Sequence, residues 1–308
     1  MERRVGIIAS GRQWRDRGRV VGFPHRHLFE GLKRIGREPM VVAGGQWPLL
    51  TEPVEAVFLW NGTKGRAGEY ARRFRQQGTV VFVMEHGWFD RRRHVQIDHK
   101  SFAHAASWAT REHFDSPALQ KGRMRFRRAF GRLPKPLKSA KTRPGYILVL
   151  LQVPGDSQLR DSEIGSPGPL VRAVEAAAPA GCEIQVRPHP LHEWTCHPKG
   201  RARTMGGPLS EAVEGATFCV TINSTAGIES LALGCPVLCL GPALYATAGV
   251  ALQTSLADMP AAMAKMAQGW SACGGTTKAV HNFLYHLACR QWSFDEIAEG
   301  SVLRGLWV

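Results

Sequence analysis

The sequence predicts an α/β protein built from two successive Rossmann-like halves. Short apolar runs alternate with segments of helical pattern over the first 84 residues, and the same alternation starts again at Tyr146. A basic stretch with several prolines separates the two halves. The chain has 308 residues, 44% of them hydrophobic, so it is long enough for two domains with separate cores.

The first half reads as strands that alternate with helices. Strands are predicted at 5–9, 40–43, 56–60 and 79–84, and helices near 24–35 and 66–77. Beyond Met84 the pattern becomes irregular and basic. We therefore predict a first Rossmann-like domain over residues 1–120.

A basic segment follows this domain. From Lys121 to Arg143 the chain has ten basic residues and no acidic one. Prolines at 134, 136 and 144 argue against a continuous helix, because proline lacks the backbone N–H that a helix interior requires. Residues 121–145 are therefore predicted to be a basic linker or binding loop.

The second half repeats the alternation. Strands are predicted at 146–153, 183–187, 217–222 and 236–240, and helices near 169–178, 226–233 and 258–266. These elements define a second Rossmann-like domain over residues 146–275. The segment 276–308 reads as C-terminal helices that cross back to the first domain.

Charge is the feature of the composition that points to a partner. There are 40 Lys and Arg residues against 25 Asp and Glu, a net charge of +15. Blocks of one sign favour a polyanionic partner such as nucleic acid or an anionic lipid surface, while an ordinary solvated basic surface is the alternative. The seven cysteines form no CxxC pair and indicate reduced thiols of a cytoplasmic protein. We expect neither a signal peptide nor a membrane-spanning segment.

The junction from Phe218 to Glu229 is the most informative local feature. A buried strand runs directly into a helix there, and Ser224 or Thr225 is placed to cap the first free N–H groups of that helix. Such a junction attracts phosphate, and Gly227 leaves room for a ligand to approach. An ordinary capped strand-helix junction without a ligand is the alternative.

Three further loops follow predicted strands. They begin at Glu85, at Gln152 and at Arg187. Because ligands bind outside the carboxyl ends of parallel strands, polar residues in these loops are candidates for a binding site. His189, His192, Cys196 and His197 have the composition of a zinc site, but their spacing matches no closed tetrahedral pattern, so no metal is expected.

Taken together, these residues resemble the capsular polysaccharide biosynthesis proteins that are retaining Kdo-type glycosyltransferases of GT-B architecture. The resemblance covers roughly residues 79 to 295. It rests on Gln152, Val153, Asp156 and Ser157, on Arg187 to Pro190, on Asn223 to Gly227 with Glu229, and on Gly241, Tyr245, Leu252 and Gln253. It implies two Rossmann-like domains that face each other across a cleft, the first binding the acceptor and the second the nucleotide sugar.

The resemblance also implies a role for each residue. Asp156 would be the nucleophile of a double displacement, and Glu85 the general acid and base. The donor would be held by Gln152, Ser157, Arg187, His189, Asn223, Ser224, Thr225, Gly227, Glu229 and Tyr245. No cofactor is expected besides the nucleotide sugar, which is a co-substrate. Trp88, Phe89, Asp90 and Arg91 depart from the family pattern after Glu85, which leaves the donor sugar open.

The basic residues bear on the acceptor. Short members of this type also look like genes of tailed bacteriophages, whose glycosyltransferases modify hydroxymethylated bases. We therefore favour hydroxymethylpyrimidine DNA as the acceptor, with phosphates contacted by Arg91, Arg92, Arg93, Arg123, Arg125, Arg127 and Arg128. The alternative acceptor is a capsule glycolipid at the inner membrane surface. A third hypothesis is an inactive nucleic-acid-binding protein on the same scaffold. The sequence leaves the oligomeric state open.

Overall fold

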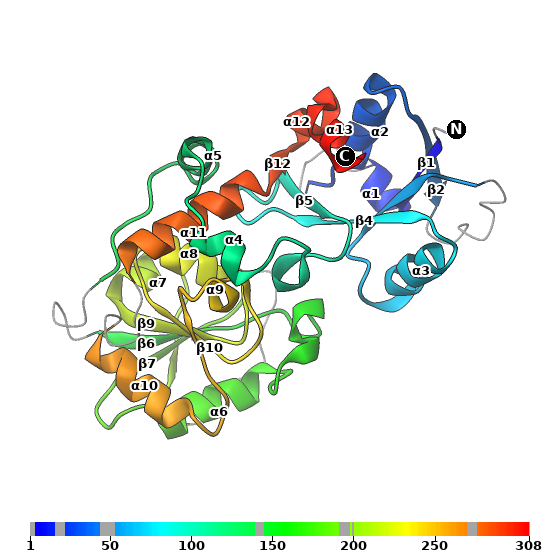
Figure 1. Ribbon diagram of the computed structural model, residues 1–308. Coiled ribbons are helices and arrows are strands. Elements are labelled where there is room, and N and C mark those ends of the chain that lie inside the picture. The colour runs from blue at the N-terminus through cyan, green and yellow to red at the C-terminus, as the bar shows by residue number, and fades with distance from the viewer. Residues whose placement is uncertain are drawn as a thin grey trace. The chain divides into compact units, whose positions relative to one another are not determined.

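The chain divides into two compact units. The computed structural model describes residues 4–15, 22–43, 53–138, 145–190, 198, 200–269 and 276–307. Unit 1 comprises residues 1–108, 124–131 and 287–308, and unit 2 comprises residues 109–123 and 132–286. The boundaries fall within α5 (Gln120–Phe130) and at the end of α11 (Thr277–Cys289) (Figure 1). The C-terminal 22 residues thus belong to the same unit as the N-terminus.

Unit 1 is organised around a six-stranded sheet in the order β12-β5-β4-β3-β1-β2. The strands are β1 (Arg4–Ala9), β2 (Glu38–Ala43), β3 (Ala56–Trp60), β4 (Val80–His86), β5 (His94–Asp98) and β12 (Trp292–Ser293). Strands β1 to β4 run parallel to one another, whereas β5 pairs antiparallel with both β4 and β12. The four parallel strands bring their carboxyl ends to one edge of the sheet.

Helices cover both faces of this sheet. They are α1 (Gly11–Arg15), α2 (His25–Arg34), α3 (Gly65–Gln76), α12 (Phe294–Glu299) and α13 (Ser301–Arg304), with 3-10 turns at Ala103–Ala105 and Gly305–Trp307. Leu28 and Leu32 of α2 join Phe294 and Ile297 of α12 in a core with Phe58 and Phe82 of the strands. Figure 1 shows α3 on the opposite face.

Unit 2 contains a second six-stranded sheet, in the order β11-β10-β9-β6-β7-β8, in which every pairing is parallel. The strands are β6 (Tyr146–Leu150), β7 (Ile184–Arg187), β8 (Arg203–Thr204), β9 (Ala216–Thr221), β10 (Val237–Cys239) and β11 (Leu252–Gln253). The central strands are almost entirely buried, as expected for a parallel sheet covered on both faces.

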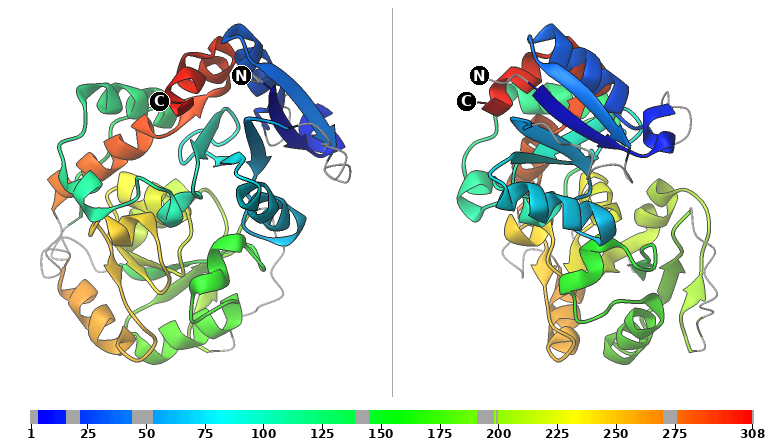
Figure 2. Two further views of the ribbon diagram at one scale, coloured as in Figure 1. Left: turned by 45° about the vertical axis from the view of Figure 1, so that its right-hand side comes forward. Right: turned by 90° about the vertical axis from the view of Figure 1, so that its right-hand side faces the viewer.

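The helices of unit 2 form a layer on each side of its sheet. They are α4 (Arg111–Asp115), α6 (Pro167–Ala177), α7 (Leu209–Gly215), α8 (Ala226–Ala232), α9 (Leu244–Thr247), α10 (Met259–Gln268) and most of α11, with the 3-10 turn η4 at Ser157–Asp161. Val171, Val174 and Met263 pack from α6 and α10 onto Val149 and Val220. The left view of Figure 2 shows these two helices side by side, beneath the sheet.

The structure differs from the sequence predictions at the basic segment. We predicted a basic linker or loop over 121–145 that is not a continuous helix. The structure has no helix through the whole described part of this segment, but α5 (Gln120–Phe130) occupies its first part. The prolines at 134, 136 and 144 lie beyond Phe130, so they do not interrupt this helix. Phe126 and Phe130, four residues apart on α5, both contact the Phe89 ring, at centroid distances of 4.8 and 5.8 Å. Residues 131–138 are irregular, and 139–144 lie outside the described residues.

Two strands also have other limits than predicted. β4 continues through Glu85 and His86, which we had placed in a loop, because both residues pair with the antiparallel strand β5. β6 ends at Leu150, so Gln152 and Val153 belong to the following loop. The sequence pattern gave no signal for β5, since His94–Asp98 has only two apolar residues.

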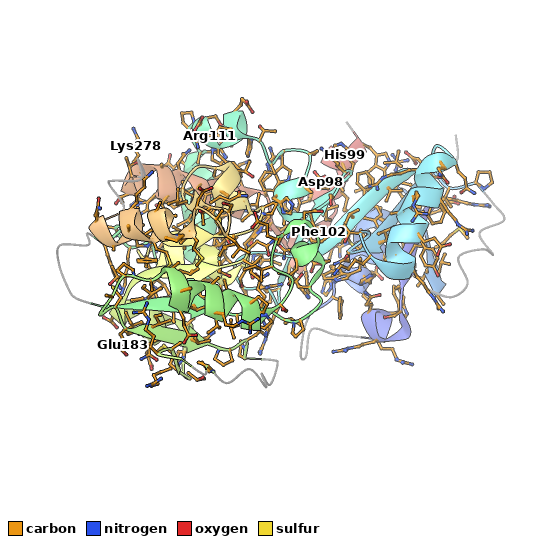
Figure 3. The ribbon with its side chains drawn as sticks, turned by 90° about the horizontal axis from the view of Figure 1, so that it is seen from below. Asp98, His99, Phe102, Arg111, Glu183 and Lys278 are labelled. Carbon is orange, nitrogen blue, oxygen red and sulfur yellow. The ribbon has the colours of Figure 1, made fainter. Side chains whose placement is uncertain are left out.

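The end of β5 is fixed by a carboxylate. The Asp98 side chain accepts hydrogen bonds from the backbone N–H groups of Lys100, Ser101 and Ser107 at 2.8 to 3.0 Å, and from the Ser107 hydroxyl at 2.6 Å. Figure 3 shows Asp98 close to His99 and Phe102 in this turn. Satisfying these backbone donors holds the chain where it leaves the sheet.

Gly31 is required where α2 meets α12. A Cβ at this position would lie 2.0 Å from the Ile297 carbonyl oxygen and 2.9 Å from Leu303 Cδ1. We predict that Gly31→Ala lowers the free energy of unfolding by about 1–3 kcal/mol, because the two helices must separate. Urea unfolding followed by circular dichroism measures this, and Gly305→Ala is the control, since no atom lies within 4 Å of a Cβ there. Equal stability of the two variants would contradict the prediction.

Candidate functional site

The carboxyl ends of the strands in unit 2 bring four sequence segments to one edge of the sheet. Leu150 of β6 pairs with Arg187 of β7, and Thr221 of β9 pairs with Cys239 of β10. Because Val149 also pairs with Val220, all four strands end at nearly the same level. The loops that carry Gln152, Arg187, Asn223 and Pro242 therefore begin side by side.

Gln152 and Asn223 join two of these loops. Gln152 Nε2 donates to Asn223 Oδ1 at 2.8 Å, and the Asn223 backbone N–H donates to Gln152 Oε1 at 2.9 Å. The Asn223 amide nitrogen also donates to the Gln158 carbonyl oxygen at 2.6 Å and to that of Pro242 at 3.2 Å. Asn223 thus connects the loops after β6 and β10 to the loop after β9, in which it lies.

These two amides do not line an open surface. Gln152 is 7% exposed and Asn223 is 3% exposed, and the bonds to the Gln158 and Pro242 carbonyl oxygens use both amide hydrogens of Asn223. We predicted that both contact the donor. In the structure their side chains contact the protein, so we now assign them a positioning role.

The start of α8 is also supported from within. Tyr245 is 1% exposed, and its hydroxyl donates to the Ser224 carbonyl oxygen at 3.1 Å. Burial raises the pKa of Tyr245 well above its usual value, so the phenol stays neutral. A Cβ on Gly227 would meet the Tyr245 ring at 3.0 Å. Gly227 and Tyr245 thus pack against each other, and their predicted contacts with the donor stay predictions.

The two candidate capping residues behave differently. Ser224 Oγ accepts a hydrogen bond from the Ala226 N–H at 3.2 Å, whereas Thr225, at the N-cap position, makes no side-chain capping bond. Thr221 was missed from the sequence: it is fully buried, and its hydroxyl donates to the Leu150 carbonyl oxygen at 3.0 Å. A polar residue at the end of an otherwise apolar strand was the available signal.

Asp156 lies at the beginning of η4. Its carboxylate accepts a hydrogen bond from the Gln158 N–H at 3.0 Å and caps this turn, and Gly155 precedes it with φ of +70°. Asp156 and Ser157 are both partly exposed. Asp156 is therefore held by its own turn while its side chain remains accessible.

Arg187 and Glu229 form the charged part of the same edge. Arg187 is half-buried at the end of β7, and its Nη2 donates to the Gly207 carbonyl oxygen at 3.1 Å. Burial lowers the pKa of Arg187, while the nearby carboxylate of Glu229 opposes this effect. The Arg187 Nε–H is buried and has no hydrogen-bond partner within the described ranges of the chain. His189, two residues on, is partly exposed.

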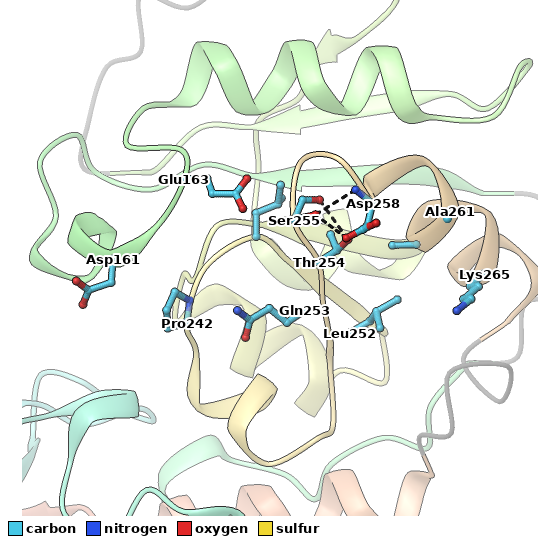
Figure 4. Close-up of a pocket in the computed structure, with 12 residues that line it drawn as sticks. Asp161, Glu163, Pro242, Leu252, Gln253, Thr254, Ser255, Asp258, Ala261 and Lys265 are labelled. Carbon is cyan, nitrogen blue, oxygen red and sulfur yellow. Dashed lines mark hydrogen bonds between the residues drawn. The ribbon is translucent and has the colours of Figure 1, made fainter.

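A pocket of about 630 Å³ lies beside the η4 loop (Figure 4). Its lining includes Asp161 at the end of η4, Pro242 after β10, and Glu163, Asp258 and Lys265. Asp258 lies at the start of α10 and its carboxylate accepts a hydrogen bond from Ser255 Oγ at 2.7 Å. The pocket therefore shares the two loops that Asn223 binds.

Glu85 lies in unit 1, apart in sequence from these residues. The Asn61 amide nitrogen donates to Glu85 Oε2 at 3.2 Å, and the backbone N–H of His86 donates to Oε1 at 2.9 Å. Asn61, with φ of +66°, follows β3 directly and accepts a bond from the Thr63 hydroxyl at 2.7 Å. Sequence reasoning missed Asn61, although a polar residue just after a buried strand was visible.

The predicted phosphate-binding arginines fall into two groups. Arg91, Arg92, Arg93, Arg123, Arg127 and Arg128 are exposed. Arg125 is half-buried and forms an ion pair with Glu296, and its guanidinium also donates to the Ala288 and Gln291 carbonyl oxygens. These bonds raise the pKa of Arg125 and tie α5 to the C-terminal segment. Arg125 is therefore a structural residue, which differs from its predicted contact with the acceptor.

Over the described parts of the chain, no group of three or more His, Cys, Asp or Glu side chains is arranged to hold a metal ion. His192, Cys196 and His197 of the considered zinc cluster lie outside the described residues. Of the helices that can be described, none is both long and apolar enough to span a bilayer.

Comparisons with known proteins support the predicted resemblance. Residues 126–270 match the family described as capsule polysaccharide biosynthesis protein, so the predicted family pattern is confirmed over this part of the chain. Protein FixF of Sinorhizobium fredii is 30% identical over 164 residues, which is 50% of this chain and 40% of FixF. The chain thus spans about two fifths of that relative.

The fold is also found among solved structures. One structure of Thermosulfurimonas dismutans KpsC, a β-Kdo 2,4 transferase, has a TM-score of 0.55 and 17% sequence identity to this chain. The alignment covers 92% of this chain and 90% of the KpsC chain. The KpsC β-Kdo 2,7 transferase has a TM-score of 0.55 and 16% sequence identity. The alignment covers 82% of this chain and 83% of that chain. This likeness extends over both units and confirms the predicted GT-B fold class.

The bonds of Asn223 lead to a stability prediction. Asn223→Ala removes the bonds that the Asn223 side chain makes with Gln152 Nε2 and with the Gln158 and Pro242 carbonyl oxygens, while the backbone bond to Gln152 Oε1 remains. We therefore expect a loss of about 2–4 kcal/mol in the free energy of unfolding. Chemical unfolding monitored by circular dichroism measures it. Gln158→Ala is the matched control, because Gln158 takes part in these bonds only through its backbone. An equal loss in both variants would refute the role assigned to Asn223.

Proposed function

We propose that this protein is a glycosyltransferase that transfers a sugar from a nucleotide sugar to a capsule-type glycan or glycolipid. One observation carries the proposal. The turn η4 begins at the accessible carboxylate of Asp156 and ends, five residues later, at Asp161 in the wall of a 630 Å³ pocket. This arrangement suits a donor whose nucleoside occupies the pocket while its sugar lies at Asp156.

The charges divide the donor between two places. Asp161, Glu163 and Asp258 offer carboxylate oxygens to the pocket and outnumber the lining cation Lys265. This balance favours ribose hydroxyls and base amino groups and disfavours phosphate. Arg187 has a buried N–H without a partner at the sheet edge, so it is the better phosphate ligand. His189, Ser224, Thr225, Ser157 and Glu229 remain proposed donor contacts around this point.

The proposed reaction is a double displacement with retention. Asp156 attacks the anomeric carbon, the bond to the phosphate oxygen breaks, and the nucleotide leaves with its electron pair. Arg187 stabilises the negative charge that develops on the leaving phosphate. Glu85 from unit 1 then takes the proton of the acceptor hydroxyl, whose oxygen displaces Asp156 from the sugar. Asn61 positions Glu85 for this step.

The comparisons favour the capsule acceptor over DNA. The matching family is described by capsule polysaccharide biosynthesis, and the structures with the same fold are described as Kdo transferases. Neither the family nor these transferases are described as acting on DNA, so the hydroxymethylpyrimidine acceptor has no such support. We propose that the exposed arginines at 91–93, 123, 127 and 128 contact an anionic glycan or lipid headgroups instead.

An acceptor experiment tests this choice. The protein is incubated with a panel of nucleotide sugars and either capsule glycolipid or hydroxymethylated DNA, and the products are read by mass spectrometry. Transfer to the glycolipid is expected. A mass shift on DNA nucleosides, with binding that falls steeply as salt increases, would restore the DNA acceptor.

The nucleophile has a direct test. Asp156→Asn should lower transfer at least about a thousandfold, because the carboxylate that forms the glycosyl ester is lost, while nucleotide binding stays within about twofold. Transfer is measured by product mass and binding by calorimetry. Asp115→Asn is the control, since Asp115 is exposed and bonded only to Arg111 among the described contacts. Full turnover by Asp156→Asn would remove Asp156 from its role.

Arg187 has a different signature. Arg187→Gln should raise the donor KM or lower kcat by roughly tenfold or more, because one charged donor to the phosphate is lost. Arg203→Gln, on the exposed neighbouring strand β8, is the matched control and should leave both constants unchanged. If only the acceptor KM changes in Arg187→Gln, the assignment to the donor phosphate is wrong.

A further inference from the structure

The sheet of unit 1 has a switch point between β1 and β3. From β1 the chain passes through α1 and α2 to β2 on one side, whereas from β3 it passes through α3 to β4 on the other side. Ligands of open parallel sheets bind outside the carboxyl ends of the strands at such a point. The proposed donor site lies in unit 2, so it does not account for this position.

Three aromatic side chains gather at this edge. Trp60 ends β3, His86 ends β4, and Phe23 comes two residues before α2. The ring of Trp60 packs edge-on against Phe23 at 4.9 Å and against His86 at 4.6 Å, and Phe23 lies 5.7 Å from His86. All three are only partly buried. They thus present aromatic surface from three separate segments.

A buried imidazole lies next to these rings. His25, the first residue of α2, is 0% exposed, and its ring is 6.0 Å from Phe23 and 6.1 Å from Trp60. Among the residues that the structure describes, neither of its ring nitrogens has a hydrogen-bond partner. A buried polar group without a partner is costly, and an apolar side chain of similar shape would avoid that cost. Burial also lowers the pKa of His25 to about 4, so the ring is neutral at pH 7 and has one donor and one acceptor nitrogen.

The chemistry of this cluster suits a sugar ring. Aromatic faces bind the C–H face of a pyranose, and a neutral imidazole pairs with a hydroxyl group as donor or acceptor. Phe23 and Trp60 have no titratable group, and the buried His25 is neutral at pH 7. It is also connected to Glu85, because Asn61, which bonds to the Glu85 carboxylate, directly follows Trp60.

We infer that Phe23, Trp60 and His86, with His25 behind them, form the subsite for the sugar ring of the acceptor. A ring hydroxyl that enters between Phe23 and Trp60 reaches the free nitrogens of His25. This inference rests on the proposed function, because it takes Glu85 to be the group that activates the acceptor. It places recognition of the acceptor's sugar ring on these aromatic residues, whereas the exposed arginines of the proposed function would contact anionic groups elsewhere on the acceptor.

Binding of methyl glycosides tests the subsite without requiring turnover. The full chain is titrated with methyl pyranosides of glucose, galactose, N-acetylglucosamine and Kdo, and binding is measured by saturation-transfer NMR. At least one glycoside should bind, and Trp60→Leu should weaken it roughly three- to tenfold. Trp292→Leu is the matched control, because Trp292 is also partly buried against the same core. Absence of binding by every glycoside, or equal binding to Trp60→Leu, would overturn the inference.

His25→Phe separates a binding role from a packing role. Phenylalanine keeps the ring and removes the unpaired nitrogens, so the melting temperature should stay the same or rise while glycoside binding weakens. If His25 only fills the core, binding will not change, and its part in the inference is refuted. Trp60→Phe, which keeps an aromatic face, should retain most of the binding lost in Trp60→Leu.

Release of nucleotide from the donor panel reports on the proposed function independently. If glycosides bind as described but no donor is cleaved or transferred, the sugar subsite stands and the transferase proposal fails. If donors are used normally by Trp60→Leu and His25→Phe with an unchanged acceptor KM, the transferase stands and the subsite is wrong.

Discussion

The amide of Asn223 is the constraint on which the candidate site of unit 2 depends. One side chain accepts from Gln152 and donates to the Gln158 and Pro242 carbonyl oxygens, so three loops share a single buried residue. Two of these loops form walls of the pocket, and the loop after β6 carries Asp156 at the start of η4. Parallel strands alone bring loops to a common edge but leave their conformations free. The network of bonds around Asn223 removes that freedom, at the cost of tying the stability of the unit to the geometry of the site.

The two units would handle charge in opposite ways under the proposed function. In unit 2 the carboxylates of the pocket and the guanidinium of Arg187 are kept apart, which matches the polar nucleoside and the anionic phosphate of one ligand. In unit 1 the rings of Phe23, Trp60 and His86 gather at the switch point, and the neighbouring His25 is uncharged because it is buried. A subsite built on aromatic rings attracts the anionic nucleotide sugar less than a guanidinium group would.

Much of the fold was predictable, and the reasons for the failures are physical. Alternating apolar runs located the parallel strands β1, β3, β6 and β9 because such strands are buried on both faces. The antiparallel strand β5 was missed because three of its five side chains are polar. For the site, strand ends identified the correct loops, but residue type could not distinguish a ligand contact from an internal bond. Asn223 and Tyr245 looked like ligand-binding residues and are buried supports. Asn61 was overlooked because its partner Glu85 lies on another strand, and His25 because its burial is visible only in the folded unit.

The net charge of +15 shows the same limit of sequence reasoning. A polyanionic acceptor was inferred from the ten basic residues between Lys121 and Arg143, on the assumption that they face solvent. Arg125 instead pairs with Glu296, and Lys138 Nζ donates to the Val213 and Glu214 carbonyl oxygens at 2.6 and 2.7 Å, at the end of α7. A cation at a helix C-terminus stabilises the helix dipole, so this charge serves the fold. The charge left for a partner is therefore smaller than the sum suggests, which weakens the case for tracking a DNA backbone and leaves a smaller anionic surface as the better match.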